Sequence, residues 1–152
     1  MTDRPVLLER FRSGSAALDE ALAGITDEEL DRRPADGGWT ARQVAHHLGD
    51  SEAMAYTRLR RLVADADPVV IQGYDEPRWS ERLHYDRPID EAVAVAHAVR
   101  AASLSLLESL TPDEWERSGQ HSEAGEYSVD RWLEIYAGHP HEHADQIRAA
   151  RG

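Results

Sequence analysis

Apolar residues recur every three or four positions over four long stretches of the chain, which is the spacing of amphipathic helices. The first stretch follows a cap at Thr2 or Asp3 and ends near Gly24. The second begins at Thr40, a good N-cap residue, and runs toward Pro68 for about 24 residues, or about 36 Å. Alternation of apolar and polar residues is almost absent, so strands are expected to be incidental.

Two further helices follow a long connection. Residues 68–88 lack sustained periodicity and are longer than most connections inside a domain, so they predict a crossover loop with a short extended piece at residues 69–71. The third helix starts between Pro88 and Asp90, and the fourth follows Ser128 as its cap. The core-facing positions of the fourth helix are Val129, Trp132, Tyr136, His139, His143 and Ile147.

An internal echo relates the two halves of the chain. The residues Leu22, Ile25, Thr26, Glu29 and Leu30 are matched 85 positions later by Leu107, Leu110, Thr111, Glu114 and Trp115. Each copy ends a helix and caps a single short turn before a polar loop. The pattern therefore predicts an all-α, four-helix bundle made of two related hairpins, with a long crossover between helices 2 and 3, in a single domain of residues 1–152.

The composition removes several kinds of chemistry. The 17 basic residues are all arginine, against 29 acidic residues, and the chain has no lysine and no cysteine. A Schiff-base lysine, a phosphate-binding Walker loop, a protein thiol nucleophile and a thiolate metal site are all excluded. The net charge of −12 disfavours nucleic acid and anionic membranes as partners. Without a membrane-length apolar run or a signal peptide, we expect a cytoplasmic protein.

Three of the eight histidines fall on predicted core-facing positions. His139 and His143 project from one face of the fourth helix at the spacing of two ligands on one metal, and His47 lies on the core-facing stripe of the second helix. His46 points about 100° away and is expected at the surface or boundary. A metal would use the lone pairs of three buried imidazoles, whereas hydrogen-bonded core histidines are the alternative.

Pro140 lies between two of these histidines. It removes the backbone donor to the carbonyl of Tyr136, so the helix is expected to kink or to end there.

Other residues with candidate roles lie outside these core-facing positions. Tyr74 and Trp79 in the crossover are expected to form pocket walls, and His121, in a polar loop, is either a substrate contact or a solvated loop histidine. Arg58, with its neighbours Arg60 and Arg61, is expected to solvate one helix face. Ser51 has no identifiable base partner in the sequence. The surface or packing histidines are His84, His97 and His141, and the remaining tryptophans Trp39, Trp115 and Trp132 are expected to cover helix ends and fill the core.

Four blocks of sequence resemble one known family. In order they read WTARQVAHHLGDS at 39–51, YDEPRW at 74–79, HSEAG at 121–125 and YAGHPHEH at 136–143. They resemble the DinB/YfiT-like superfamily of metal-dependent hydrolases, most closely its YfiT-like branch, which includes bacillithiol S-transferases. The resemblance implies a four-helix bundle that holds one divalent metal ion per chain through His47, His139 and His143. Zinc or nickel is implied first, with iron or manganese also compatible, and the family implies a homodimer.

The leading functional hypothesis joins this site to the absent cysteine. A three-histidine metal would activate the thiol of a small-molecule cosubstrate, of bacillithiol or mycothiol type, for transfer to an electrophilic substrate. One alternative is a hydrolase of a small amide or ester that uses metal-bound water, although no glutamate adjoins a ligand as in His-Glu-x-x-His. The other is a non-catalytic metal-binding or ligand-sensing bundle.

Overall fold

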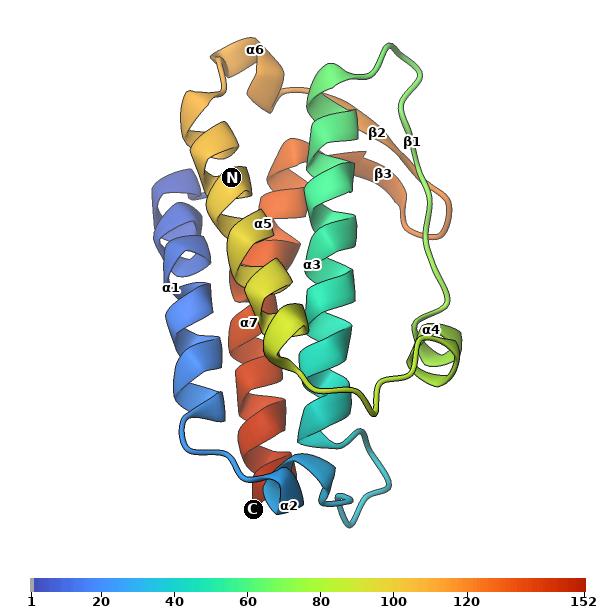
Figure 1. The fold of residues 1–152 in the computed structure, drawn as a ribbon. Helices are drawn as coiled ribbons and strands as arrows, with labels where there is room; N and C mark the ends of the chain where they lie inside the picture. The colour runs from blue at the N-terminus through green and yellow to red at the C-terminus, as the bar shows by residue number, and fades with distance from the viewer. Residues whose placement is uncertain (1) are drawn as a thin grey trace.

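Four long helices form a bundle in the computed structural model, which describes residues 2–152 (Figure 1). They are α1 (Arg4–Leu22), α3 (Ala41–Ala64), α5 (Asp90–Ser109) and α7 (Val129–Arg151). The connections hold three short helices, α2 (Asp27–Asp31), α4 (Glu76–Arg82) and α6 (Pro112–Trp115). They also hold three short strands, β1 (Val70–Ile71), β2 (Ser118–His121) and β3 (Gly125–Ser128). The predicted all-α four-helix bundle is confirmed.

The helix starts follow the caps that the sequence predicted. The side chains of Asp3, Thr40 and Ser128 each accept a hydrogen bond from a backbone N–H in the first turn of α1, α3 and α7. The two echoed turns, α2 and α6, both begin with a capping box, Thr26 with Glu29 and Thr111 with Glu114. Local sequence therefore sets where these helices begin.

The packing of the helices differs from the predicted pair of hairpins. The closely packed pairs are α1 with α7, α3 with α5, and α3 with α7. In Figure 1, α1 and α7 run in one direction and α3 and α5 in the other. The hairpin prediction was wrong because the connections at residues 23–40 and 110–128 are long enough to carry the chain across the bundle, so consecutive helices need not be neighbours.

A small sheet covers one side of α3 and α7, and the sequence did not predict it. Strand β2 pairs antiparallel with β3, with His121 opposite Gly125, and parallel with β1, with Ile71 opposite His121. The extended piece in the crossover is confirmed at Val70–Ile71, whereas the short helix α4 was not predicted. The strands are short, as expected, but the β2–β3 hairpin was not predicted, because it buries only Gly119 and Tyr127 and its apolar pattern is weak.

The core consists of two apolar clusters, one toward each end of the bundle. One surrounds Trp132 and the other surrounds Leu18. On α3 the clusters are separated between Leu48 and Ala55, and on α7 between Ala137 and Ala144. Polar side chains occupy the gap, so the candidate site lies in the middle of the bundle.

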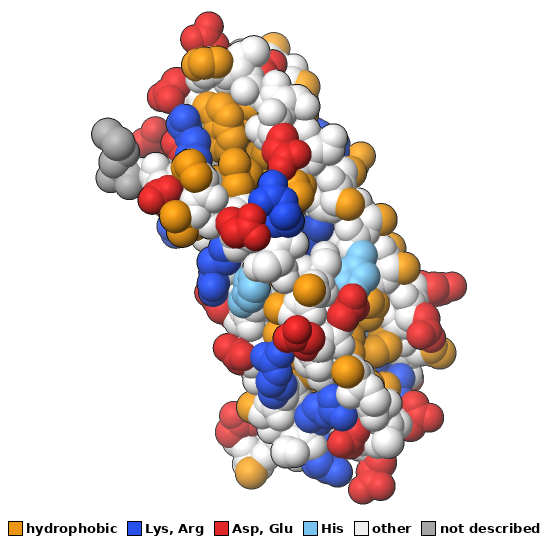
Figure 2. Space-filling view, turned by 90° about the vertical axis from the view of Figure 1, so that its left-hand side faces the viewer, with side chains coloured by type: hydrophobic (Ala, Val, Ile, Leu, Met, Phe, Trp, Pro, Cys, Tyr) orange, Lys and Arg blue, Asp and Glu red, His pale blue; other side chains and the backbone are white. Residues whose placement is uncertain are grey.

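The surface over α1 carries mixed charge. Figure 2 shows acidic and arginine side chains interspersed on this face, with hydrophobic side chains gathered toward one end. Arg12, for example, forms ion pairs with Glu9 and Glu108. Among residues 2–152, no helix combines the length and the apolar character that crossing a membrane requires.

Candidate metal centre

The three histidines at predicted core-facing positions meet between α3 and α7. One nitrogen from each of His47, His139 and His143 lies within 4.8 Å of the others. The Nε2 atoms of His139 and His143 are 3.2 Å apart. Two nitrogens bound tetrahedrally to zinc at about 2.05 Å would be about 3.3 Å apart, so this spacing suits a shared metal ion.

Hydrogen bonds at the far sides of two rings fix their protonation. Nδ1 of His139 lies 3.0 Å from Oε1 of Glu52, and Nδ1 of His143 lies 2.7 Å from Oε1 of Gln146. Because both oxygens accept, both Nδ1 atoms carry a proton, so the Nε2 atoms of the neutral rings are the ones that would bind a metal. A cation between the two Nε2 atoms would remove the repulsion between their lone pairs. The donor set therefore fits a divalent metal.

His47 completes the group as a neutral imidazole. Its side chain is buried, and its Nδ1 has no hydrogen-bond partner among the described residues. Burial, reinforced by His143 and His139, lowers the pKa of His47 to about 3. Burial also lowers the pKa of His143. At neutral pH both rings are therefore uncharged and keep a lone pair for a metal.

A buried ion pair lies behind the histidines. Glu52 on α3 is 2% exposed and Arg100 on α5 is 4% exposed, and Nη1 of Arg100 donates to Oε1 of Glu52 at 3.0 Å. The same carboxylate oxygen accepts from His139. Arg100 also donates to the carbonyl of Phe11 on α1. The Glu52–Arg100 pair thus joins the ligand-bearing helices to the rest of the bundle.

This pair also explains how α7 passes through Pro140 without ending. A proline at this position removes the N–H that would bond to the carbonyl of Tyr136, and Nη1 of Arg100 donates to that carbonyl instead, at 2.9 Å. A Cβ on Gly14 would lie 2.7 Å from both Arg100 and Pro140, so only glycine leaves room there. Of the two outcomes expected at Pro140, an end of the helix is wrong, since α7 is continuous over Val129–Arg151.

A cleft of about 300 Å³ opens beside His139. Its lining includes Ser51, Arg58, Tyr74, His121, Tyr136 and His139. Two of the three residues expected at a pocket, Tyr74 and His121, therefore line it. Trp79 stands behind the lining, with its ring centroid 4.3 Å from that of Tyr74. The sequence gave Ser51 no base partner, but its Oγ lies 3.4 Å from Nε2 of His139.

His121 lies on β2 rather than in a loop, which corrects the sequence interpretation. Its Nδ1 accepts hydrogen bonds from the backbone N–H groups of Glu123 and Ala124. The proton therefore resides on Nε2. Partial burial and the charge of Arg58 lower the pKa of His121, so the ring is a neutral donor at the edge of the cleft.

Arg58 was expected on a solvated face, and this was wrong. It is 9% exposed, and it donates to the hydroxyl of Tyr136 at 3.0 Å and to the carbonyl of Gln72 at 3.1 Å. The crossover covers this part of α3, which a helix pattern cannot reveal. Arg60 stays partly exposed over the ring of Tyr56, and Arg61 is exposed.

The other histidines have the roles expected of them, except His46. His46 is 2% exposed, stacks on Tyr85 and lies 2.8 Å from the carbonyl of Arg87, because the connection before α5 covers it. The expected surface or boundary position is therefore wrong. The three surface or packing histidines are His84, which is exposed, His97, which contacts Asp19, and His141, which contacts the carbonyl of Arg10.

Sequence reasoning missed Arg100 and gave Glu52 no firm role. Glu52 follows His47 by five residues, and its spacing alone does not distinguish it from the other acidic residues nearby. Arg100 gave no signal near the histidines, because α5 reaches the site only through tertiary packing. One clue was available: a proline inside a helix requires a replacement donor for the freed carbonyl.

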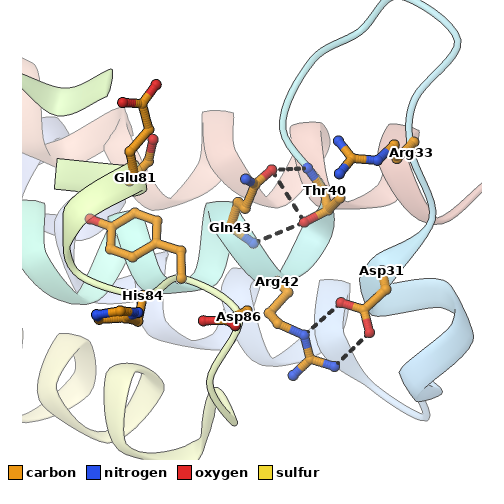
Figure 3. Close-up of a pocket in the computed structure, with 10 residues that line it drawn as sticks. Asp31, Arg33, Thr40, Arg42, Gln43, Glu81, His84 and Asp86 are labelled. Atoms are coloured by element: carbon orange, nitrogen blue, oxygen red, sulfur yellow. Dashed lines mark hydrogen bonds and ion pairs between the residues drawn. The ribbon is translucent and has the colours of Figure 1, made fainter. Parts of the chain in front are cut away.

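A second cleft, of about 350 Å³, lies away from the histidine trio, near the start of α3. Figure 3 shows its polar lining, in which Arg42 pairs with Asp31 and Gln43 bonds to Thr40. Its best-placed polar groups are thus used in a structural ion pair and a helix cap. The cleft beside His139 is the better candidate for a site.

Comparison with known proteins now defines the class. The model of the DinB superfamily matches residues 10–147, and the chain belongs to this superfamily. A protein of Oceanobacillus iheyensis, named "Putative metal-dependent hydrolase", is 38% identical over 130 residues, which cover 86% of this chain and 75% of the relative. The similarly named YfiT of Bacillus subtilis is 34% identical over 135 residues, covering 87% and 75%.

A solved structure supports the same assignment. YfiT from Bacillus subtilis, described as a probable metal-dependent hydrolase with an unusual four-helix bundle topology, matches with a TM-score of 0.88 and 28% identity. The match covers 99% of this chain and 87% of that one. The predicted family resemblance is confirmed.

Proposed function

We propose that the protein is a metal-dependent enzyme that transfers a small-molecule thiol to an electrophilic substrate. The observation that carries the proposal is the pair of Nε2 lone pairs, 3.2 Å apart, on histidines whose Nδ1 protons are fixed by Glu52 and Gln146. The names of the relatives support metal dependence. His47, His139 and His143 would hold one divalent ion, with zinc or nickel as the first candidates.

The bound ion would supply Lewis-acid chemistry, which lowers the pKa of a thiol or of water. The chain's own residues position the proposed ligands. Glu52 keeps the proton of His139 on Nδ1, and Arg100 holds the Glu52 carboxylate in position. Ser51 and Tyr74 line the cleft through which a substrate would approach.

The placement of carboxylates favours a thiol over water as the nucleophile. Hydrolysis needs a base near the attacking water, but the buried carboxylate of Glu52 is already bonded to Arg100 and to His139. The carboxylates that line the cleft, Glu76 and Glu123, are exposed. A thiol requires no such base, because its pKa is already close to neutral. In the transfer, the new sulfur–carbon bond forms as the leaving group departs from carbon, and the thiol proton passes to solvent.

Hydrolysis of a small amide or ester is the second candidate, favoured by the names of the relatives. The two are separated by assaying metal-loaded protein with a panel of thiols, including bacillithiol and mycothiol, against a bimane electrophile, and with a panel of model esters and amides. Conjugation that is lost in His143→Ala and kept in His97→Ala supports the transferase. Hydrolysis without conjugation would establish the second candidate, and turnover with neither panel would contradict both.

A further inference from the structure

The cleft beside His139 contains a buried positive charge that no carboxylate neutralises. Arg58 is 9% exposed, and within residues 2–152 no carboxylate lies within ion-pair distance of its guanidinium. The other deeply buried arginine, Arg100, is paired with Glu52. Burying an unpaired charge is costly, so an arginine in this position requires an explanation.

The hydrogen bonds of Arg58 leave it with unused capacity. Nη1 donates to the Tyr136 hydroxyl and Nη2 to the carbonyl of Gln72, both of which are neutral acceptors. Nε is buried and has no partner among the described residues. Guanidinium groups bind carboxylates through two parallel N–H donors, and this one forms no such bond to any of residues 2–152.

Two tyrosine hydroxyls in the same cleft are also unpartnered. Tyr74 and Tyr127 line the cleft, and the buried hydroxyl of each has no hydrogen-bond partner among the described residues. Burial raises the pKa of Tyr74 to about 12 and also raises that of Tyr127, so both hydroxyls keep their protons at neutral pH. The ring of Tyr74 lies 5.8 Å from the guanidinium carbon of Arg58. Arg58 Nε and these two hydroxyls are therefore donors without a hydrogen-bond acceptor among the described residues in the walls of one cleft, and the Tyr74 hydroxyl lies on its Ser51 side.

The other end of the cleft is the histidine site. Ser51, which lies 3.4 Å from His139, and Arg58 both line the cleft from α3. Seven residues separate them along the helix, or about 10 Å at the usual helical rise. One small molecule could therefore contact both ends.

We propose that the Arg58 end of the cleft is a carboxylate-binding subsite, and that the molecule which reacts at the histidines carries a carboxylate that contacts Arg58 while its reacting atom lies beside His139. Arg58 supplies the charge, and the Tyr74 and Tyr127 hydroxyls supply further donors. Glu76 and Glu123, exposed at the rim, disfavour ligands with many negative charges, such as polyphosphates. The link to a reacting thiol rests on the proposed function, whereas the carboxylate subsite does not.

Matched thiol probes test the proposal on the full chain. Mercaptohexanoate and mercaptohexanol would be titrated into cobalt(II)-loaded protein, and binding would be followed by the sulfur-to-cobalt charge-transfer band. We expect the carboxylate probe to bind about tenfold to a hundredfold more tightly than the alcohol, as for hydrogen bonds to a charged group. Mercaptopropionate, which is too short to span the cleft, should lose most of this advantage.

Variants on the same helix assign the preference to Arg58. Arg58→Gln should bring the ratio of the two affinities close to one, and Arg58→Lys, the variant to use if Arg58→Gln does not fold, should lower it. Arg61→Gln removes the same charge from an exposed position and should leave the ratio unchanged. Equal affinity of the two probes in the natural protein, or an unchanged ratio in both Arg58 variants, would overturn the proposal.

A second readout does not depend on the metal or on the reaction. Hexanoate, titrated into metal-free protein, should shift the Arg58 Nε–H signal in a ¹H–¹⁵N spectrum, whereas hexanol should not. If no thiol gives a charge-transfer band but hexanoate still shifts this signal, the proposed function fails and the carboxylate subsite stands. Absence of the shift would contradict the subsite itself.

Discussion

The two buried arginines of this bundle both bond to Tyr136 and differ in how completely they are paired. Arg100 bonds to the carboxylate of Glu52 and to the backbone carbonyls of Phe11 and Tyr136. Among residues 2–152, Arg58 bonds only to a hydroxyl and a carbonyl, and it faces a cleft. The first arrangement is closed and joins the four bundle helices, whereas the second is left open. We infer that Arg100 serves stability and ligand position, and that Arg58 serves binding.

Replacing each arginine with methionine gives the largest expected contrast. Arg100→Met leaves the Glu52 carboxylate buried without a cation and should lower the free energy of unfolding by about 3–5 kcal/mol. Arg58→Met loses two hydrogen bonds but also removes an unpaired buried charge, so its change should stay within about 1 kcal/mol. Urea unfolding of both variants measures the difference. Equal losses would show that Arg58 is as structural as Arg100.

The closed arrangement can be tested through its tight packing. Gly14→Ala places a Cβ 2.7 Å from Arg100 and Pro140 and should destabilise the protein by about 1–3 kcal/mol. Gly138→Ala on α7 meets only ordinary contacts at 3.4 Å or more, and should be neutral or stabilising by up to about 1 kcal/mol. Thermal unfolding of the pair gives the comparison. Equal stability of Gly14→Ala and Gly138→Ala would show that Arg100 and Pro140 leave room for a Cβ at position 14.

Metal affinity should respond to the closed arrangement and not to the open one. Glu52→Gln weakens the acceptor that holds the Nδ1 proton of His139, and we expect metal affinity to fall about 10–100-fold. Arg58→Gln, a glutamine replacement in the open arrangement, should change it by less than about twofold, since Arg58 contacts no proposed ligand. Competition with a chromophoric chelator measures both. A comparable loss in Arg58→Gln would break the division between the two arrangements.

The pH dependence of stability tests a separate contribution, which belongs to His47. Its pKa in the folded, metal-free protein is lowered to about 3, below the ordinary 6.5, so the unfolded chain binds the proton more readily. Stability should therefore fall as the pH falls from 6.5 toward 3, by about 1.4 kcal/mol per unit from this residue. His47→Gln should remove that part of the slope. The measurement is urea unfolding with a chelator present, and identical slopes in both proteins would contradict the assignment.

Much of the fold and the centre of the site were predictable because both depend on helical spacing. The caps at Thr40 and Ser128 fix where α3 and α7 begin, and periodicity then sets which residues face inward. His139 and His143 share a face because they are four residues apart. The crossover was predictable because residues 68–88 lack this helical periodicity.

The rest depends on contacts between segments far apart in the sequence. Arg58 and His46 were expected at or near the surface, but the connections that flank α4 cover them. The hairpin of β2 and β3 turns over residues 122–124, and Gly125, with a φ of +79°, follows as the first residue of β3; a glycine directly after a three-residue loop was the available signal. Arg100 reaches the carbonyl freed by Pro140 from another helix, which no local pattern records.

The metal content of the purified chain is the most direct test of the three-histidine site. Elemental analysis of the natural protein should find about one divalent ion per chain, and His143→Ala should lose most of it. His97→Ala, a histidine variant on the surface of α5, should keep the full amount. A full complement of metal in His143→Ala would contradict the three-histidine site.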